Sequence, residues 1–144
     1  MTSPITSAIA PDLDAIAQLV SKAISGLPAA YKVMATAVAV NIMEFAPEDL
    51  LAEIGVMDPF EFTGLYTGIP LPEKSEDDPT SATDTIWIFR RPILDEWAMR
   101  GDVSIAQMVT HVTINELSHH FGWTPEEITK IDADWSWDAP QDND

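Results

Sequence analysis

The sequence predicts an α+β fold for this chain of 144 residues. The length suits one domain, hydrophobic residues make up 46% of the chain, and helical patterns are interspersed with strand patterns. No internal repeat or long linker divides the sequence. We therefore expect one domain over residues 11–134, a flexible leader over 1–10 and an acidic tail over 135–144.

The first part of the chain is predicted to hold helices on either side of one strand. After Pro11, apolar residues recur every three or four positions until a Gly-Leu-Pro turn ends the run. Further on, Val38, Val40 and Ile42 recur at every second position, as in a strand. The predicted elements are a helix from Leu13 to Ile24, a short helix over Ala29–Met34, a strand within Ala37–Phe45 and a helix from Pro47 to about Gly55.

The second part is predicted to add strands and helices in alternation. The Thr-Ile-Trp-Ile-Phe run that begins at Thr85 is β-branched and aromatic and is the clearest strand. Asp102 is expected to cap the longest helix, Gly122 to end it, and Thr124 to cap the helix after it. The predicted elements are an edge strand within Gly64–Pro72, an exposed loop over Lys74–Thr83, a strand over Thr85–Arg90, a helix over Ile93–Met99, a helix over Val103–Phe121 and a final helix from Thr124.

Charge is the most unusual feature of the composition. Asp and Glu number 24 against 7 Lys and Arg, which gives a net charge of −17. This charge repels nucleic-acid phosphate and anionic lipid, so we expect neither nucleic acid nor membrane as a partner. It favours basic partners and cations, although a salt-adapted, acid-rich proteome would produce the same value.

The absence of cysteine excludes disulfides, cysteine-ligated zinc, iron–sulfur clusters and cysteine nucleophiles. The first ten residues carry no base and no long apolar stretch, unlike a secretory signal. No apolar run approaches the roughly 20 residues that span a bilayer. We therefore expect a cytoplasmic protein.

Polar groups interrupt the apolar face of the helix predicted over Val103–Phe121. On a helical wheel, a stripe of apolar residues continues into Glu116 and His119. A buried glutamate beside a histidine is costly unless each has a partner. Two interpretations stay open: an ordinary satisfied pair, or a site in a cleft at the end of this helix. The neighbouring His120 is equally compatible with a surface position.

Three segments of the chain resemble the small bacterial zincin-like metallopeptidases, which have a matrix-metalloprotease-like domain. Asn115–Gly122 (N-E-L-S-H-H-F-G) is similar to the family's motif helix, H-E-x-x-H-H-F-G. Gly64–Leu71 (G-L-Y-T-G-I-P-L) and Ile88–Trp97 (I-F-R-R-P-I-L-D-E-W) are similar to two further family segments. The resemblance covers roughly residues 10–130. It implies a minimal zincin-like domain, with a small mixed sheet packed on helices and a central motif helix.

The resemblance also implies zinc-dependent peptide hydrolysis. In the family motif, two histidines one helical turn apart bind Zn²⁺, and the glutamate between them deprotonates the metal-bound water. In this chain Glu116 occupies the position of that base and His119 the second ligand position. The third ligand of the family is thought to be an aspartate three residues after the glycine.

The sequence departs from the family pattern at two of these ligand positions. Asn115 stands at the first, where a carboxamide is a weak, neutral ligand for zinc, and Pro125 stands at the third, where it offers none. Glu126 is the best replacement carboxylate, because the helix cap before it would aim it back toward the site. His111 lies about 12 Å along the helix axis from the second ligand, too far to share a metal ion with it.

Two functions of different classes follow from this pattern. The first is a zinc-dependent metallopeptidase in which Glu116 is the general base, His119 a zinc ligand, and Asn115 and Glu126 weak or vestigial ligands. The second is a metal-free, inactive pseudo-peptidase that acts as a binding or regulatory module. Either function takes a peptide or protein as substrate or partner, and zinc content distinguishes them.

The other two segments have structural as well as functional interpretations. Tyr66, flanked by glycines, either lies on the edge strand along which a zincin binds its peptide substrate or only shapes a turn. Arg90 and Arg91 are expected to pair with Asp95, Glu96 or another acid rather than to bind substrate. The tryptophans expected to pack in the core or at its edge are Trp87, Trp97 and Trp123.

Overall fold

The computed structural model describes residues 10–74 and 84–132, and it confirms the α+β prediction. The predicted leader before Ala10, the predicted loop after Lys74 and the acidic tail lie outside the described residues. In chain order, the elements are α2 (Leu13–Ser25), α3 (Ala29–Ala35), β1 (Ala39–Met43), α4 (Glu48–Ile54), β2 (Gly64–Thr67), η1 (Leu71–Glu73), β3 (Thr85–Phe89), α5 (Arg90–Arg100), α6 (Ile105–Phe121) and α7 (Pro125–Ile131).

The sheet is mixed and has the strand order β1–β3–β2. β1 runs parallel to β3, with Ala39 opposite Thr85, and β2 runs antiparallel to β3, with Gly64 opposite Ile88. β3 lies between the other two strands, and its side chains are largely buried on both faces of the sheet, as is typical of a central strand. β2 is therefore an edge strand, as predicted, and its outer edge borders no other strand of the described chain.

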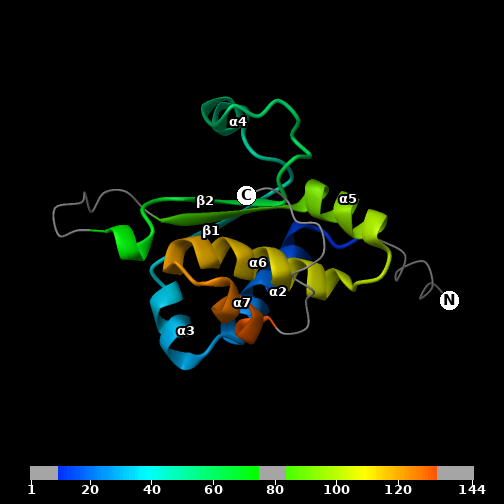
Figure 1. The fold of residues 1–144 in the computed structure, drawn as a ribbon. Coiled ribbons are helices and arrows are strands. Elements are labelled where there is room, and N and C mark those ends of the chain that lie inside the picture. Colours follow the sequence, from blue (N-terminus) through cyan, green and yellow to red (C-terminus); the bar gives the residue numbers. More distant parts are fainter. Residues whose placement is uncertain (1–9, 75–83, 133–144) are drawn as a thin grey trace.

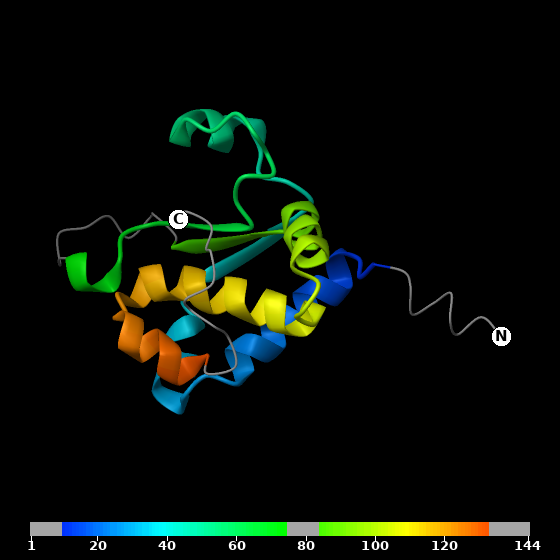
Figure 2. The same cartoon turned by 45° about the vertical axis from the view of Figure 1, so that its right-hand side comes forward.

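Helices α2 and α6 cover one face of the sheet, and α4 lies over the other face (Figure 1 and Figure 2). Ile86 and Ile88 point toward the helices and pack in buried clusters with residues of α2 and α6. Phe89 points the other way and packs with Leu50 of α4. Because successive side chains of a strand alternate between faces, the apolar run of β3 builds a core on both sides of the sheet.

Helix α6 is the central helix of the fold, as the family resemblance implies. It contacts α2, α5 and α7 as well as β2 and β3. Ile114 and Leu117 lie outside the apolar stripe that leads to Glu116 and His119. Both are nevertheless buried, so α6 is enclosed around much of its circumference. None of the helices in the described ranges, α6 included, is long and apolar enough to cross a membrane.

Two helices begin at residues other than those predicted. Ser104, not Asp102, caps α6: its hydroxyl accepts the backbone N–H of Gln107 at 3.0 Å, and the Gln107 side chain accepts the N–H of Ser104 at 2.9 Å. This capping box satisfies two helix-terminal donors reciprocally. α5 begins at Arg90, before Pro92, because a proline fits in the first turn, where its missing N–H has no helical acceptor.

Arg90 pairs with an acidic residue, as expected, whereas the contact shown for the Arg91 side chain is with an aromatic ring. Nη1 of Arg90 lies 2.8 Å from Oε1 of Glu44, so its acidic partner comes from the segment after β1 and not from α5. The guanidinium of Arg91 lies over the ring of Phe45, 5.6 Å from its centroid. The three tryptophans predicted to pack in or around the core, Trp87, Trp97 and Trp123, are half-buried or buried.

Candidate functional site

A cleft of about 720 Å³ lies where the C-terminal half of α6 meets β2, η1 and the start of α7. Asn115, Glu116 and His119 of the motif helix line it. This arrangement favours a site in a cleft over an ordinary pair in the core. Apolar side chains form most of the remaining wall: Ile54, Phe62, Leu65, Pro70, Pro72, Trp123 and Ile128.

Glu116 lies deep in this cleft, with 2% of its surface exposed. The side-chain amide of Asn115 donates toward its carboxylate, with 3.5 Å between Nδ2 and Oε2. The start of β2 lies against the same side chain, since a Cβ on Gly64 would be 3.1 Å from Cγ of Glu116 and 2.9 Å from the carbonyl oxygen of Trp87. Glycine at position 64 therefore allows the edge strand to approach the helix closely enough to bury Glu116.

The structure brings three of the predicted site residues together, because Asn115, Glu116 and His119 all line the cleft. His119 is half-buried and follows Asn115 by one helical turn, so the two side chains project from the same side of α6. Pro125, at the third ligand position of the family motif, also lines the cleft. Glu126 is exposed on α7 and is not among the described residues that line the cleft. Its part in metal binding stays a prediction.

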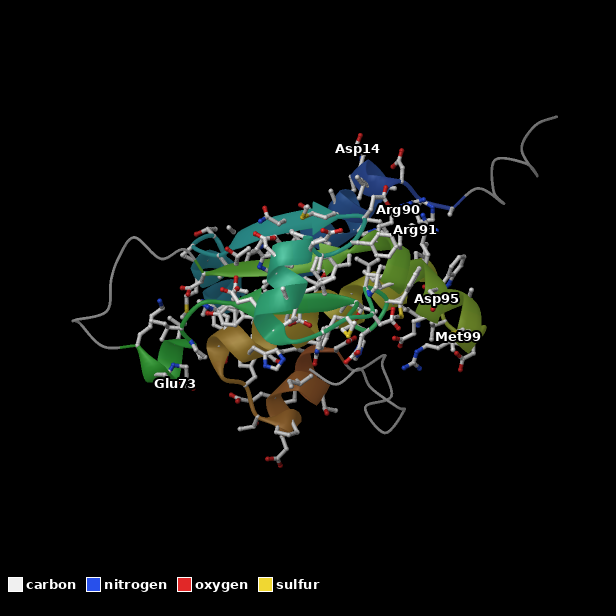
Figure 3. All side chains as sticks on the ribbon, turned by 90° about the horizontal axis from the view of Figure 1, so that it is seen from above. Asp14, Glu73, Arg90, Arg91, Asp95 and Met99 are labelled. Carbon is white, nitrogen blue, oxygen red and sulfur yellow. The ribbon has the colours of Figure 1, made fainter. Side chains whose placement is uncertain are left out.

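Sequence reasoning missed one acidic residue of the cleft. Glu73 ends the short helix η1 and lines the same cleft as His119. Its signal in the sequence is its place two residues after the Gly64–Leu71 segment, which resembles a segment of the family. Figure 3 shows Glu73 at one end of the sheet, while Arg90 and Arg91 lie at the other end.

The residues at the family's three ligand positions do not fit a catalytic zinc ion. A catalytic zinc site generally has three protein ligands, chosen from imidazole, carboxylate and thiolate. Here His119 supplies the imidazole, Asn115 supplies a neutral carboxamide and Pro125 supplies nothing. Within residues 10–74 and 84–132, no group of three or more His, Asp or Glu side chains is placed to hold a metal ion.

Next to the cleft, a polar network ties β2 to the end of α6. Oη of Tyr66 lies 2.9 Å from Nδ1 of His120 and 3.2 Å from Oδ1 of Asp84, and Nζ of Lys74 lies 3.0 Å from Oδ2 of Asp84. Gly68 has a φ of 141°, and a Cβ there would lie 2.3 Å from Oδ1 of Asp84, so only glycine leaves room for the network. His120 is 2% exposed, which rules out the surface position.

The directions of the pKa shifts in this network favour one protonation state. Burial raises the pKa of Tyr66 well above its ordinary value, and the Asp84 carboxylate adds to the effect. Burial alone raises the pKa of Asp84, but Lys74 and the hydrogen bonds from Ile69 and Tyr66 outweigh it and lower that pKa. Burial lowers the pKa of His120. We therefore expect a neutral Tyr66 that donates to charged Asp84 and accepts from Nδ1–H of neutral His120.

Comparison with known proteins agrees with this architecture. The protein family described as zincin-like metallopeptidase matches residues 35–135, a range that contains all three motif segments and the whole sheet. No curated protein matches the chain. Since the family match covers more than half of the sequence, the chain belongs to the zincin-like metallopeptidase family.

Proposed function

We propose that this chain binds an extended peptide in the cleft beside α6, and that it does so without zinc catalysis. One observation carries the proposal: the cleft at the sheet edge is kept, while Asn115 and Pro125 stand at two of the metal-ligand positions that line it. The loss of ligands affects metal chemistry, whereas the groove and the strand serve peptide binding. Peptide binding is therefore separable from metal chemistry in this chain.

The edge of β2 supports the peptide-binding part of the proposal. Leu65 and Tyr66 both line the cleft, although neighbouring side chains of a strand point to opposite faces, so the cleft must reach around the strand's edge. The N–H of Phe89 donates to the carbonyl of Thr63 at 3.0 Å. By the alternation of an antiparallel ladder, the backbone groups of Gly64 and Tyr66 then point away from β3. A peptide would pair with these groups by adding a strand to the sheet.

Peptide hydrolysis is the second candidate function, and Glu116 favours it. Its carboxylate is kept at the position of the general base, nearly fully buried and in the same cleft as His119. In this reading Glu116 would take a proton from the water that attacks the peptide carbonyl. A metal ion would then need a ligand such as Glu126 in addition to His119.

The test uses the full chain, freed of metal with a chelator, and a library of extended peptides of about ten residues. Isothermal calorimetry is expected to find peptides that bind at about micromolar Kd, near −8 kcal/mol. N-methylation of a bound peptide at alternate residues is expected to abolish binding in one register and to spare it in the other, since only one set of N–H groups meets β2.

Two results would overturn this proposal. One is the absence of any peptide that binds the metal-free chain. The other is tight, stoichiometric zinc together with peptide cleavage that Glu116→Gln abolishes, which would establish the second candidate instead.

A further inference from the structure

The charged residues of the cleft bear on which peptides it would bind, an inference that rests on the proposed function. Glu73 and Glu116 line the cleft, and no lysine or arginine does. None of the residues outside the described ranges is a lysine or arginine either, so no segment of this chain can supply one to the cleft wall. The side chain of Glu116 is buried, whereas Glu73 is exposed, so Glu73 is the carboxylate that a basic side chain in the cleft can reach.

None of the seven lysines and arginines of the chain lines the cleft, and Lys32 is exposed on α3. Lys74, Arg90 and Arg100 form ion pairs with Asp84, Glu44 and Glu96, respectively. Arg91 lies over an aromatic ring, and Lys22 lines a separate cavity between α2 and α6. Lys130 is on α7, but the same helix also carries Glu126 and Glu127. A peptide that enters the cleft therefore meets glutamates, but no lysine or arginine, among its apolar lining residues.

The apolar part of the wall continues onto the exposed surface. Ile54, at the end of α4, lines the cleft and is 40% exposed. The segment that leads from Ile54 to Phe62 exposes Met57 by 95% and Phe60 by 42%. Exposed apolar side chains next to a groove are typical of an interaction site. This segment extends the apolar contact beyond the groove itself.

We propose that the occupant of the cleft is an extended peptide segment in which lysine or arginine stands next to apolar residues. The apolar side chains would contact the wall formed by residues such as Phe62 and Leu65, and the basic side chain would lie near Glu73. Charge complementarity raises the association rate and excludes acidic competitors. The net charge of −17 also attracts basic peptides at long range.

The experiment compares three peptides that share length and apolar residues but carry Lys, Ser or Glu at the remaining positions. Each is titrated into the full, metal-free chain by calorimetry. We expect the Lys peptide to bind about tenfold more tightly than the Ser peptide, the Glu peptide to bind least, and the difference to shrink in 1 M salt.

Two charge-removing variants separate the cleft from the overall charge. Glu73→Gln is expected to reduce the preference for the Lys peptide over the Ser peptide several-fold. Asp14→Asn removes the same charge from α2, far from Glu73 (Figure 3), and is expected to leave the preference unchanged.

Equal affinity for the three peptides would overturn this inference and leave the proposed function standing. Equal effects of the Glu73 and Asp14 variants would also overturn it, because the selection would then come from net charge. Binding of none of the peptides would overturn the proposed function as well.

Discussion

The hydroxyl oxygen of Tyr66 and Nδ1 of His120 lie 2.9 Å apart and join the edge strand to the motif helix. Tyr66 also lines the cleft, so the network that positions this side chain fixes part of the cleft wall. Asp84, the residue before β3, completes the link by accepting a hydrogen bond from the same hydroxyl. The position of β2 relative to α6 therefore depends on polar contacts as well as on apolar packing.

Removal of the Tyr66 hydroxyl is expected to destabilise the chain. Tyr66→Phe leaves Nδ1–H of the buried His120 without its acceptor and removes one donor from Asp84, and we expect the free energy of unfolding to fall by about 1–3 kcal/mol. Urea unfolding measures the change. The matched control is Tyr31→Phe, since Tyr31 packs its ring against Phe121 and Trp123; this change is expected to stay within about 0.5 kcal/mol. Equal losses for the two variants would contradict the network.

Protonation of His120 is expected to make stability fall in mild acid. The folded-state pKa of His120 lies below the ordinary value of 6.5, so the unfolded chain binds the proton first as the pH falls. Stability from this residue is complete above pH 6.5 and is lost as the pH falls toward the folded-state pKa. Urea unfolding from pH 8 to pH 5 should therefore show a smaller decline for His120→Gln than for the wild type. Parallel declines would show that His120 is not responsible.

A side chain at position 64 is expected to disturb the contact between β2 and α6. Gly64→Ala places a Cβ against Trp87, Val112 and Glu116, at 2.9 to 3.1 Å, and overpacking of this kind costs about 1–3 kcal/mol. We expect the melting temperature, measured by thermal unfolding, and the affinity for peptide, measured by calorimetry, both to decrease. Gly26→Ala is the control, because its Cβ would have only ordinary contacts, at 3.6 Å or more. A Gly64 variant as stable as this control would disprove the close approach.

Restoring the ligands of the family motif is expected to create a zinc site. The wild-type chain is expected to bind zinc no more tightly than roughly millimolar, about −4 kcal/mol. Asn115→His with Pro125→Asp adds an imidazole one turn from His119 and a carboxylate at the start of α7, where both positions already line the cleft. We expect at least micromolar affinity by calorimetry. His119→Ala in the double variant is the control and should abolish the gain; a double variant that binds no zinc would show that the site is misplaced.

Much of this molecule follows from the local pattern of the sequence. The β-branched and aromatic composition of Thr85–Phe89 and the helical spacing after Ser104 are local properties of the sequence, so both elements were predictable. Glu116 and His119 were predictable from the motif and from the interrupted apolar stripe. The cap of α6 was predicted two residues too early, at Asp102, because several nearby polar residues suit a helix cap and only the contact with Gln107 selects Ser104.

The features that join distant parts of the chain follow from how its elements pack. The family motif, the substituted ligand positions Asn115 and Pro125, and a net charge that favours basic partners are already visible in the sequence. Only packing showed that His120 is buried against Tyr66, and that Glu73 joins the cleft while Glu126 stays outside its described lining. The physical reason is that periodicity encodes which face of an element is buried, whereas the partner of that face depends on how the strands and helices assemble.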